Sequence, residues 1–279
     1  MKKSLAFILA GAMVVASLTA CGSNTKETTA ETSAETTAET TAESAESTAA
    51  DGETYKIGVL QLTEHAALDA ANEGFVAALD ASGISYEIDQ QNAQNDQSAC
   101  QTIAEKLVND GDDLILAIAT PAAQAVAGVT TEIPVVGTAI TDFADSGLVE
   151  SNEAPGGNVT GSSDLTPIEA QISLLQKVLP EAKTVGVLYC SAESNSEIQL
   201  KMTKEACDAA GLQVEEFAVA SSNEIQSVVE SAVGKVDCLY SFTDNTIAAG
   251  MNTVSMVANE NNLPVICGAG AEEPSAPDH

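Results

Sequence analysis

The chain has 279 residues, enough for two ordinary domains, and carries 41 acidic against 10 basic residues, for a formal net charge of −31. Every basic residue is a lysine, and a strongly acidic chain without arginine argues against nucleic-acid binding and against an enzyme that clamps phosphate. Hydrophobic residues make up 44% but aromatic residues only 3%, so the cores are expected to consist of Val, Ile, Leu and Ala.

Residues 1–20 have the layout of a signal peptide. Lys2 and Lys3 precede an apolar run, residues 5–15, that is too short to span a bilayer. The following Leu-Thr-Ala-Cys, ending at Cys21, resembles the lipobox of bacterial lipoproteins. The resemblance implies cleavage before Cys21 and acylation of the mature chain, including a diacylglyceryl group on the sulfur; an incidental cysteine beside an ordinary cleavage site is the alternative.

Residues 21–54 form an acidic segment rich in Thr, Ala and Glu. Interleaved Thr and Ser disfavour a helix, no apolar side chains are available to pack, and the regular negative charges repel one another. The segment is therefore predicted to be a flexible linker.

Residues 55–159 are predicted to form a first α/β lobe. Buried strands are expected at 57–60, 85–88, 114–118 and 135–136, separated by helices at 65–82, at 97–109 and from Thr120 onward, where Thr120 would cap the helix and Pro121 occupy its first turn. Alternating strands and helices predict a parallel sheet with right-handed crossovers.

Residues 160–279 repeat this scheme about 130 positions later, as expected of two similar domains. A capping box is expected at 166–169, strands at 185–188, 214–219, 238–242 and 265–266, and helices at 195–210, 221–233 and 246–259. Between the halves lies Pro155 to Gly161, where Gly156, Gly157 and Asn158 are predicted to form the crossing and hinge. The predicted fold is thus α/β with two Rossmann-like lobes.

Five cysteines follow Cys21, and none are spaced as C-x-x-C. They are interpreted as reduced thiols that act as small apolar residues. With only His65 and His279 available as imidazoles, no metal site and no cofactor are predicted.

The loops after the strands are the expected ligand site, because doubly wound sheets bind ligands at the carboxyl ends of their strands. The backbone amides of Ala122 and Ala123 could hold a carboxylate, helped by Ser196, or simply begin a helix. Asp142, Glu193 and Asp244 could each hold an ammonium group or cap a turn. The full set of candidate ligand-binding residues is Thr63, His65, Thr120, Pro121, Ala122, Ala123, Thr141, Asp142, Tyr189, Glu193, Asn195, Ser196, Asp244 and Asn245.

The sequence lacks G-x-S-x-G, G-x-G-x-x-G and Walker loops, so binding is expected rather than catalysis.

Several short stretches together resemble the ABC-transporter substrate-binding lipoproteins of the tryptophan/tyrosine-uptake type. They are Thr120 to Gln124, Thr141-Asp142, Gly147 to Val149, Pro155 to Gly161, Val187 to Tyr189, Glu193 to Ser196 and Thr243 to Thr246. The resemblance implies the type I periplasmic-binding-protein fold and an aromatic amino acid as ligand. It also implies an ABC permease and ATPase as partners, and a lipid-anchored position on the extracytoplasmic face of the membrane. A ligand-sensing receptor of the same fold, or a binder of a sugar or purine, is the alternative.

The sequence departs from the family in two places. Phe143 follows Thr141-Asp142 where the family has proline, which is expected to reshape that wall of the cleft. The family's chain also continues beyond the last predicted strand and crosses back to the first lobe. The return segment of the second lobe is therefore expected to be missing. Either the sequence is a truncated product, or the first lobe is left with an uncovered edge and only one crossing.

Overall fold

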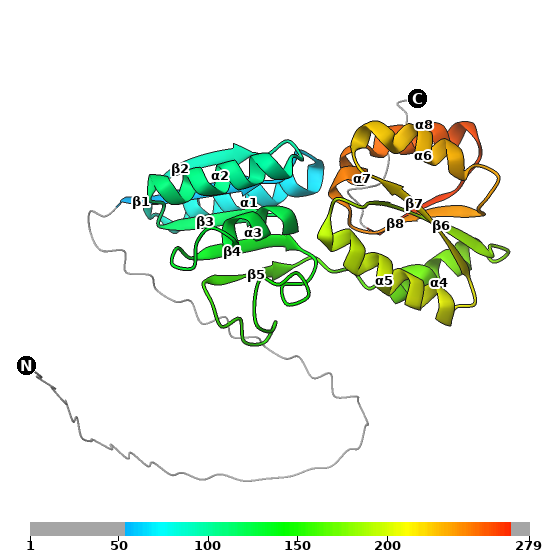
Figure 1. Cartoon of the computed structure of the whole chain (residues 1–279), viewed down its shortest axis with the longest axis horizontal. Coiled ribbons are helices and arrows are strands. Elements are labelled where there is room, and N and C mark those ends of the chain that lie inside the picture. Colours follow the sequence, from blue (N-terminus) through cyan, green and yellow to red (C-terminus); the bar gives the residue numbers. More distant parts are fainter. Residues whose placement is uncertain (1–53, 269–279) are drawn as a thin grey trace, which may run out of the picture. The chain divides into compact units, whose positions relative to one another are not determined.

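The computed structural model describes residues 54–268 (Figure 1). The expectations for the signal peptide, for Cys21, for the linker up to residue 53 and for the tail 269–279 lie outside these residues. None of the helices between residues 54 and 268 is both long enough and apolar enough to cross a membrane.

The first lobe is a five-stranded parallel sheet with helices on both faces. Its strands follow the order β2-β1-β3-β4-β5, and every neighbouring pair is parallel. The elements are β1 (Thr54–Gln61), α1 (Ala66–Ser82), β2 (Ser85–Asn92), α2 (Gln97–Asp110), β3 (Leu114–Ile118), α3 (Thr120–Ala127), β4 (Val135–Ile140) and β5 (Val159–Ser163).

The second lobe contains a four-stranded parallel sheet with the order β7-β6-β8-β9. Its elements are α4 (Ile168–Val178), β6 (Thr184–Cys190), α5 (Ser194–Ala209), β7 (Gln213–Val219), the 3-10 helix η1 (Ser222–Glu224), α6 (Ile225–Ala232), β8 (Cys238–Ser241), α7 (Asn245–Ala249), α8 (Met251–Glu260) and β9 (Val265–Cys267). The predicted α/β class and the alternation of strands and helices are confirmed in both lobes.

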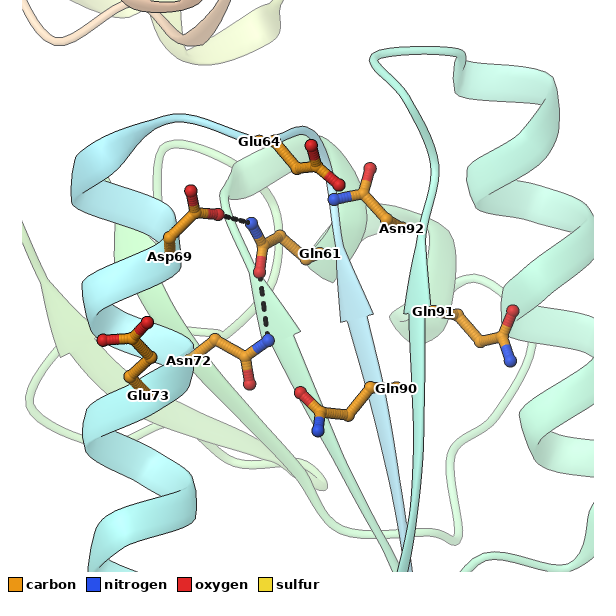
Figure 2. A pocket seen from close by; sticks show the side chains of 8 residues that line it. All are labelled: Gln61, Glu64, Asp69, Asn72, Glu73, Gln90, Gln91 and Asn92. Carbon is orange, nitrogen blue, oxygen red and sulfur yellow. Dashed lines mark hydrogen bonds between the residues drawn. The ribbon is translucent and has the colours of Figure 1, made fainter.

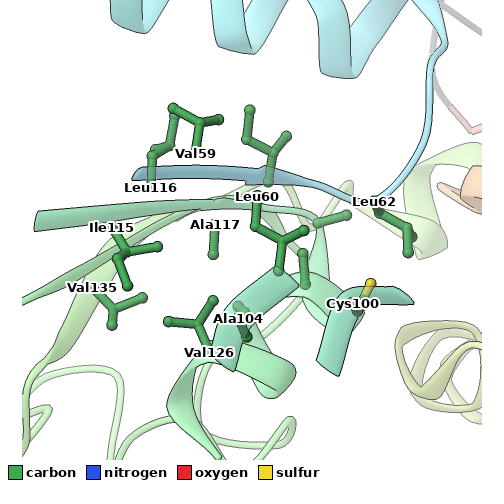
Figure 3. Packing of buried hydrophobic residues seen from close by; sticks show 14 of the residues in the cluster. Val59, Leu60, Leu62, Cys100, Ala104, Ile115, Leu116, Ala117, Val126 and Val135 are labelled. Atoms are coloured by element: carbon green, nitrogen blue, oxygen red, sulfur yellow. The ribbon is translucent and has the colours of Figure 1, made fainter. Parts of the chain in front are cut away.

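The core of the first lobe has two layers, one on each face of its sheet. Val59 and Leu116, paired across β1 and β3, point toward α1, whereas Leu60 and its neighbour Ala117 point toward α2 and α3 (Figure 3). All four side chains are buried, so these strands read as continuous apolar runs. Burying an aliphatic side chain of this size stabilises the fold by about 1.5–3 kcal/mol.

The second lobe buries side chains on both faces of its sheet in the same way. Val187 belongs to the cluster formed with α4 and α5, and Leu188 to the cluster formed with α6 and α8. The free thiols of Cys207 and Cys238 lie buried in the first of these clusters, as predicted for cysteines that pack as small apolar residues.

Helix boundaries differ from prediction where tertiary packing decides them. Thr120 does not cap α3; it lies inside the helix, after Ala119 with φ 81°, and its hydroxyl accepts from the Thr141 amide at 3.4 Å. The capping box at 166–169 is also wrong, because α4 begins at Ile168 without a side-chain cap. The single helix predicted at 246–259 is broken at Gly250, where a Cβ atom would lie 2.2 Å from Ile225 Cδ1.

The structure also corrects the predicted position of the hinge, which was Gly156, Gly157 and Asn158. These residues precede β5, which pairs with β4 and is the edge strand of the first sheet. The Asn158 side chain donates to the Ile133 carbonyl at 2.7 Å, which fixes it within the first lobe. The crossing between the lobes is therefore residues 164–167, and the first lobe extends beyond residue 159. A short extended segment has the same sequence pattern whether it pairs with a neighbouring strand or crosses from one lobe to the other.

Gly161 should prove essential for the pairing of β5 with β4. A Cβ atom at this position would lie 1.9 Å from the Gly137 carbonyl oxygen, whereas one at Gly157 would meet nothing within 4 Å. We predict that Gly161→Ala lowers the free energy of unfolding by about 1–3 kcal/mol or more, because the strands must separate. Gly157→Ala is the matched control and should leave chemical denaturation unchanged. Equal midpoints for the two variants would contradict the prediction.

Candidate functional site

A cavity of about 260 Å³ lies between the two lobes, at the carboxyl ends of their strands. Both lobes and the crossing segment contribute to its wall. The lining residues are His65, Ala67 and Leu68 at the start of α1, Ala139 and Thr141 at the end of β4, Asp164 and Thr166 in the crossing, Asn195 in α5, and Thr243, Asp244, Asn245 and Ala248 around α7.

Residues with an unpartnered polar atom are concentrated in the wall of this cavity. Seven buried side-chain polar atoms of the described residues have no hydrogen-bond partner, and four of them belong to cavity-lining residues: His65 Nδ1, Asp164 Oδ1, Thr166 Oγ1 and Asn195 Oδ1. Buried polar atoms are normally paired, because each unpaired one costs about 1–3 kcal/mol. Burial also raises the pKa of the Asp164 carboxyl. The residues of the wall thus hold hydrogen-bonding atoms that the described part of the chain leaves unpaired.

Glu193 organises the second lobe's side of the cavity. Its Oε1 accepts from the Thr246 amide at 2.9 Å and from the Thr246 hydroxyl at 2.8 Å. Its Oε2 accepts from Asn195 Nδ2 at 3.2 Å, and from the amide and the side-chain nitrogen of Asn245 at 3.3 and 2.6 Å. The carboxyl group therefore joins the loop after β6 to the start of α7. We call residues 192–195 and 244–246 together the rim of the second lobe.

Four hydrogen bonds join the first lobe to this rim. The first-lobe residues belong to separate elements, so the contact between the lobes is broad. The pairs are His65 Nε2 with Asn245 Oδ1 at 3.3 Å, Asn95 Nδ2 with Thr246 Oγ1 at 2.7 Å, Gln124 Oε1 with the Ser194 hydroxyl at 2.8 Å, and Gln97 Nε2 with the Ala192 carbonyl.

Asp244 is a buried N-cap of α7 rather than an open carboxylate. It accepts from the Cys190 amide at 2.6 Å, from the Ser196 hydroxyl at 2.7 Å and from the Ile247 amide at 2.8 Å. Burial and the nearby Glu193 charge raise the pKa of Asp244 to about 7. Its carboxyl group fixes β6, α5 and α7 against one another.

Five of the residues predicted from the sequence line the cavity: His65, Thr141, Asn195, Asp244 and Asn245. Glu193 and Ser196 lie directly behind them, bound to Asn245 and Asp244 respectively.

The predicted carboxylate site at the start of α3 does not line the cavity. Thr120, Pro121, Ala122 and Ala123 are all buried in the helix, and the Ala123 amide already donates to the Ala119 carbonyl at 3.1 Å. The small side chains pack in the core instead of leaving the amides open.

Three further predicted residues also lie elsewhere. The carboxylate of Asp142 accepts from the Asp145 amide and from Asn152, so it caps a turn. Tyr189 packs in the core and donates to Glu216 Oε2 at 3.1 Å, and its burial is the main reason that its pKa rises to about 12. Thr63 is buried, and its carbonyl accepts from Gln61 Nε2 at 2.8 Å.

Asp164, Thr166 and Thr243 were missed as site residues. Asp164 follows β5 directly, so the rule that ligands meet strand ends would have selected it, had β5 been recognised as a strand. Leu68, Ala67, Ala139 and Ala248 add an apolar wall, which a search for polar side chains overlooks.

A second, more polar pocket of about 350 Å³ lies between α1 and β2 in the first lobe (Figure 2). Three of its eight lining side chains bond to one another: Gln61 Nε2 donates to Asp69 Oδ1 at 2.7 Å, and Asn72 Nδ2 donates to Gln61 Oε1 at 3.1 Å. Across residues 54–268, no group of His, Cys, Asp and Glu is placed to hold a metal ion. The cavity between the lobes is therefore the candidate site.

Asp244 should make the stability of the protein depend on pH. Because the folded-state pKa of about 7 exceeds the ordinary 3.8, the folded state keeps a proton that the unfolded state has lost. The free energy of unfolding should then fall as the pH rises from about 4 to about 7. In Asp244→Asn this fall should be smaller, as measured by urea denaturation across that range. Parallel pH profiles for variant and wild type would contradict the assignment.

Comparison with known proteins is consistent with this architecture. A family model described as ABC transporter substrate binding protein matches residues 56–273. The "Tyrosine-binding protein" of Clostridioides difficile strain R20291 is 41% identical over 270 residues, which cover 95% of this chain and 74% of that protein.

Two solved structures are similar in both sequence and fold. An ABC domain from Streptococcus pneumonia in complex with L-Trp is 42% identical, with a TM-score of 0.76 over 79% of this chain and 76% of that one. The ligand-free, open structure of a substrate binding protein with adhesive properties from Clostridium difficile is 44% identical, with a TM-score of 0.56 over 78% and 75%. The two-lobe architecture is the type I periplasmic-binding fold. The chain belongs to the ABC transporter substrate-binding protein family.

Proposed function

We propose that the protein binds an aromatic amino acid in the cavity between its lobes and delivers it to an ABC importer. The four unpartnered polar atoms at the cavity carry this proposal, because an amino acid offers both hydrogen-bond donors and acceptors in a small volume. The relatives described as tyrosine-binding and as bound to L-Trp support the choice of ligand class.

The ligand's ammonium group is assigned to Asp164 and Asn195. Both present a buried oxygen without a partner, and an oxygen acceptor requires a donor. Asp164 is also acidic, and its raised pKa shows that burial disfavours its charged form. A cation placed beside this carboxyl would offset that cost. Among the described residues, no lysine lines the cavity to compete for it.

The carboxylate and the side chain of the ligand are assigned to the remaining wall. The hydroxyl of Thr166 has no partner and can donate to a carboxylate oxygen. Leu68, Ala67, Ala139 and Ala248 provide apolar surface for a ring. This arrangement replaces the carboxylate site that the sequence suggested at α3.

Delivery requires closure and release of the lobes around the crossing at residues 164–167. In the proposed function, the chain works on the extracytoplasmic face of the membrane, held by a lipid on Cys21, with a permease and an ATPase as partners and with no chemistry performed on the ligand. The linker at 21–54 would give the lobes reach toward the permease.

Binding of L-Tyr and L-Trp by isothermal titration calorimetry tests the ligand assignment. Asp164→Asn is expected to weaken both by about tenfold to a hundredfold, because a charge-assisted hydrogen bond is lost. Asp142→Asn is the matched control, since that carboxylate caps a turn away from the cavity, and it should bind as the wild type does. A thermal-shift screen in which a sugar or purine stabilises the protein while no amino acid does would refute the proposal.

Lipid anchoring is tested at Cys21. In bacteria fed labelled palmitate, the wild-type protein should become labelled and remain with the membrane, because two acyl chains hold a protein stably at a bilayer. Cys21→Ser should lose the label and leave the membrane fraction, whereas Cys267→Ser should behave as the wild type does. Label retained on Cys21→Ser would exclude acylation at this residue.

A further inference from the structure

We propose that His65 selects ligands whose side chain carries a hydrogen-bond donor, such as a phenol O–H or an indole N–H, over phenylalanine, which has none. This inference rests on the proposed function and adds to it a specificity-determining residue. It follows from the hydrogen bonds that fix the two ring nitrogens of His65.

The first step is the orientation of the Asn245 amide. Its nitrogen donates to Glu193 Oε2 at 2.6 Å, so its oxygen is the atom that lies 3.3 Å from His65 Nε2. An amide oxygen has no hydrogen to give. The proton of this hydrogen bond must therefore lie on His65 Nε2.

The second step is the state of the other ring nitrogen. Burial is the main influence on His65 and lowers its pKa, so the ring is neutral at neutral pH and carries a single proton. With that proton on Nε2, Nδ1 is a bare acceptor. Nδ1 is buried and has no partner within the described part of the chain.

The third step is the position of His65, which is one of the residues that line the cavity. His65 adjoins Ala67 and Leu68, which belong to the apolar wall at the start of α1. Asp164 and Asn195 already supply two oxygen acceptors for the ammonium group. We therefore assign the remaining acceptor, Nδ1 of this lining residue, to the ligand's ring.

The selectivity has a direct physical cause. When a phenol or indole donor meets Nδ1, a buried atom gains its hydrogen bond. When phenylalanine occupies the same place, Nδ1 stays buried and unpaired, and the ligand is bound about tenfold to a hundredfold more weakly.

Calorimetric titration of the full chain with L-Tyr, L-Trp and L-Phe measures this selectivity. The wild type should prefer Tyr or Trp over Phe by about tenfold or more. His65→Phe, which keeps a ring but removes both nitrogens, should bring this ratio close to one. Asn95→Ala is the control: it removes a bond between the lobes outside the cavity wall, to Thr246, and should weaken all three ligands alike.

A pH titration of the wild type provides a second test that does not depend on a variant folding. Protonation turns Nδ1 into a donor, so the Tyr-to-Phe affinity ratio should persist at neutral pH and fall once the pH drops below the lowered pKa of His65. Asp69 on the same helix, Glu193 on the opposite lobe, and Asp164 and Asp244 in the cavity wall also face this region. Their charges act on the ammonium and carboxylate groups, which all three amino acids share. Their effects on affinity therefore cancel in the Tyr-to-Phe affinity ratio.

The outcomes separate the two proposals. Binding of all three amino acids with equal affinity, an unchanged ratio in His65→Phe, or a ratio that is constant through the acid range would each overturn the assignment to His65 and leave the proposed function standing. Absence of binding for every aromatic amino acid would overturn the proposed function itself.

Discussion

The rim of the second lobe depends on the buried carboxyl group of Glu193. Five donors converge on its two oxygens, and they come from Asn195 in α5 and from Asn245 and Thr246 in α7. Removing this group would leave buried amides and hydroxyls unpaired at several points at once. The hydrogen bonds that Asn95 and His65 send from the first lobe both end on residues that Glu193 holds. Two of the four hydrogen bonds that join the first lobe to this rim therefore depend on this one side chain.

Among the described residues, those that line the cavity include the carboxyl groups of Asp164 and Asp244 but no lysine. Asp244 is neutralised in part by its own raised pKa of about 7, and the pKa of Asp164 is raised by burial. Internal amide and hydroxyl donors satisfy Glu193 and Asp244, but they leave Asp164 Oδ1 unpartnered. An electrostatic environment of this kind favours a cation, which is the part of an amino acid that the proposed function places there.

The crossing between the lobes is also part of the cavity wall. Asp164 and Thr166 lie within residues 164–167, between the last strand of the first sheet and α4. Hinge closure changes the backbone angles of a few such residues. In the proposed function, a ligand that binds these two side chains therefore acts directly on the segment that must bend, and affinity and closure are coupled through the same residues.

Local patterns in the sequence determined the α/β class. Strands buried on both faces are continuous apolar runs, whereas helices place apolar residues every three to four positions. Residues 57–60 and 114–118 could be assigned in this way. The sequence also indicated that the loops after the strands hold the site, and His65, Asn195 and Asn245 were among its candidates. Only the tertiary structure decided that β5 pairs with β4 instead of crossing between the lobes, and that the amides of α3 are buried. It also decided that Asp164 Oδ1 and His65 Nδ1 lack partners among the described residues. Pairing and burial depend on residues far apart in the chain, and no local pattern encodes them.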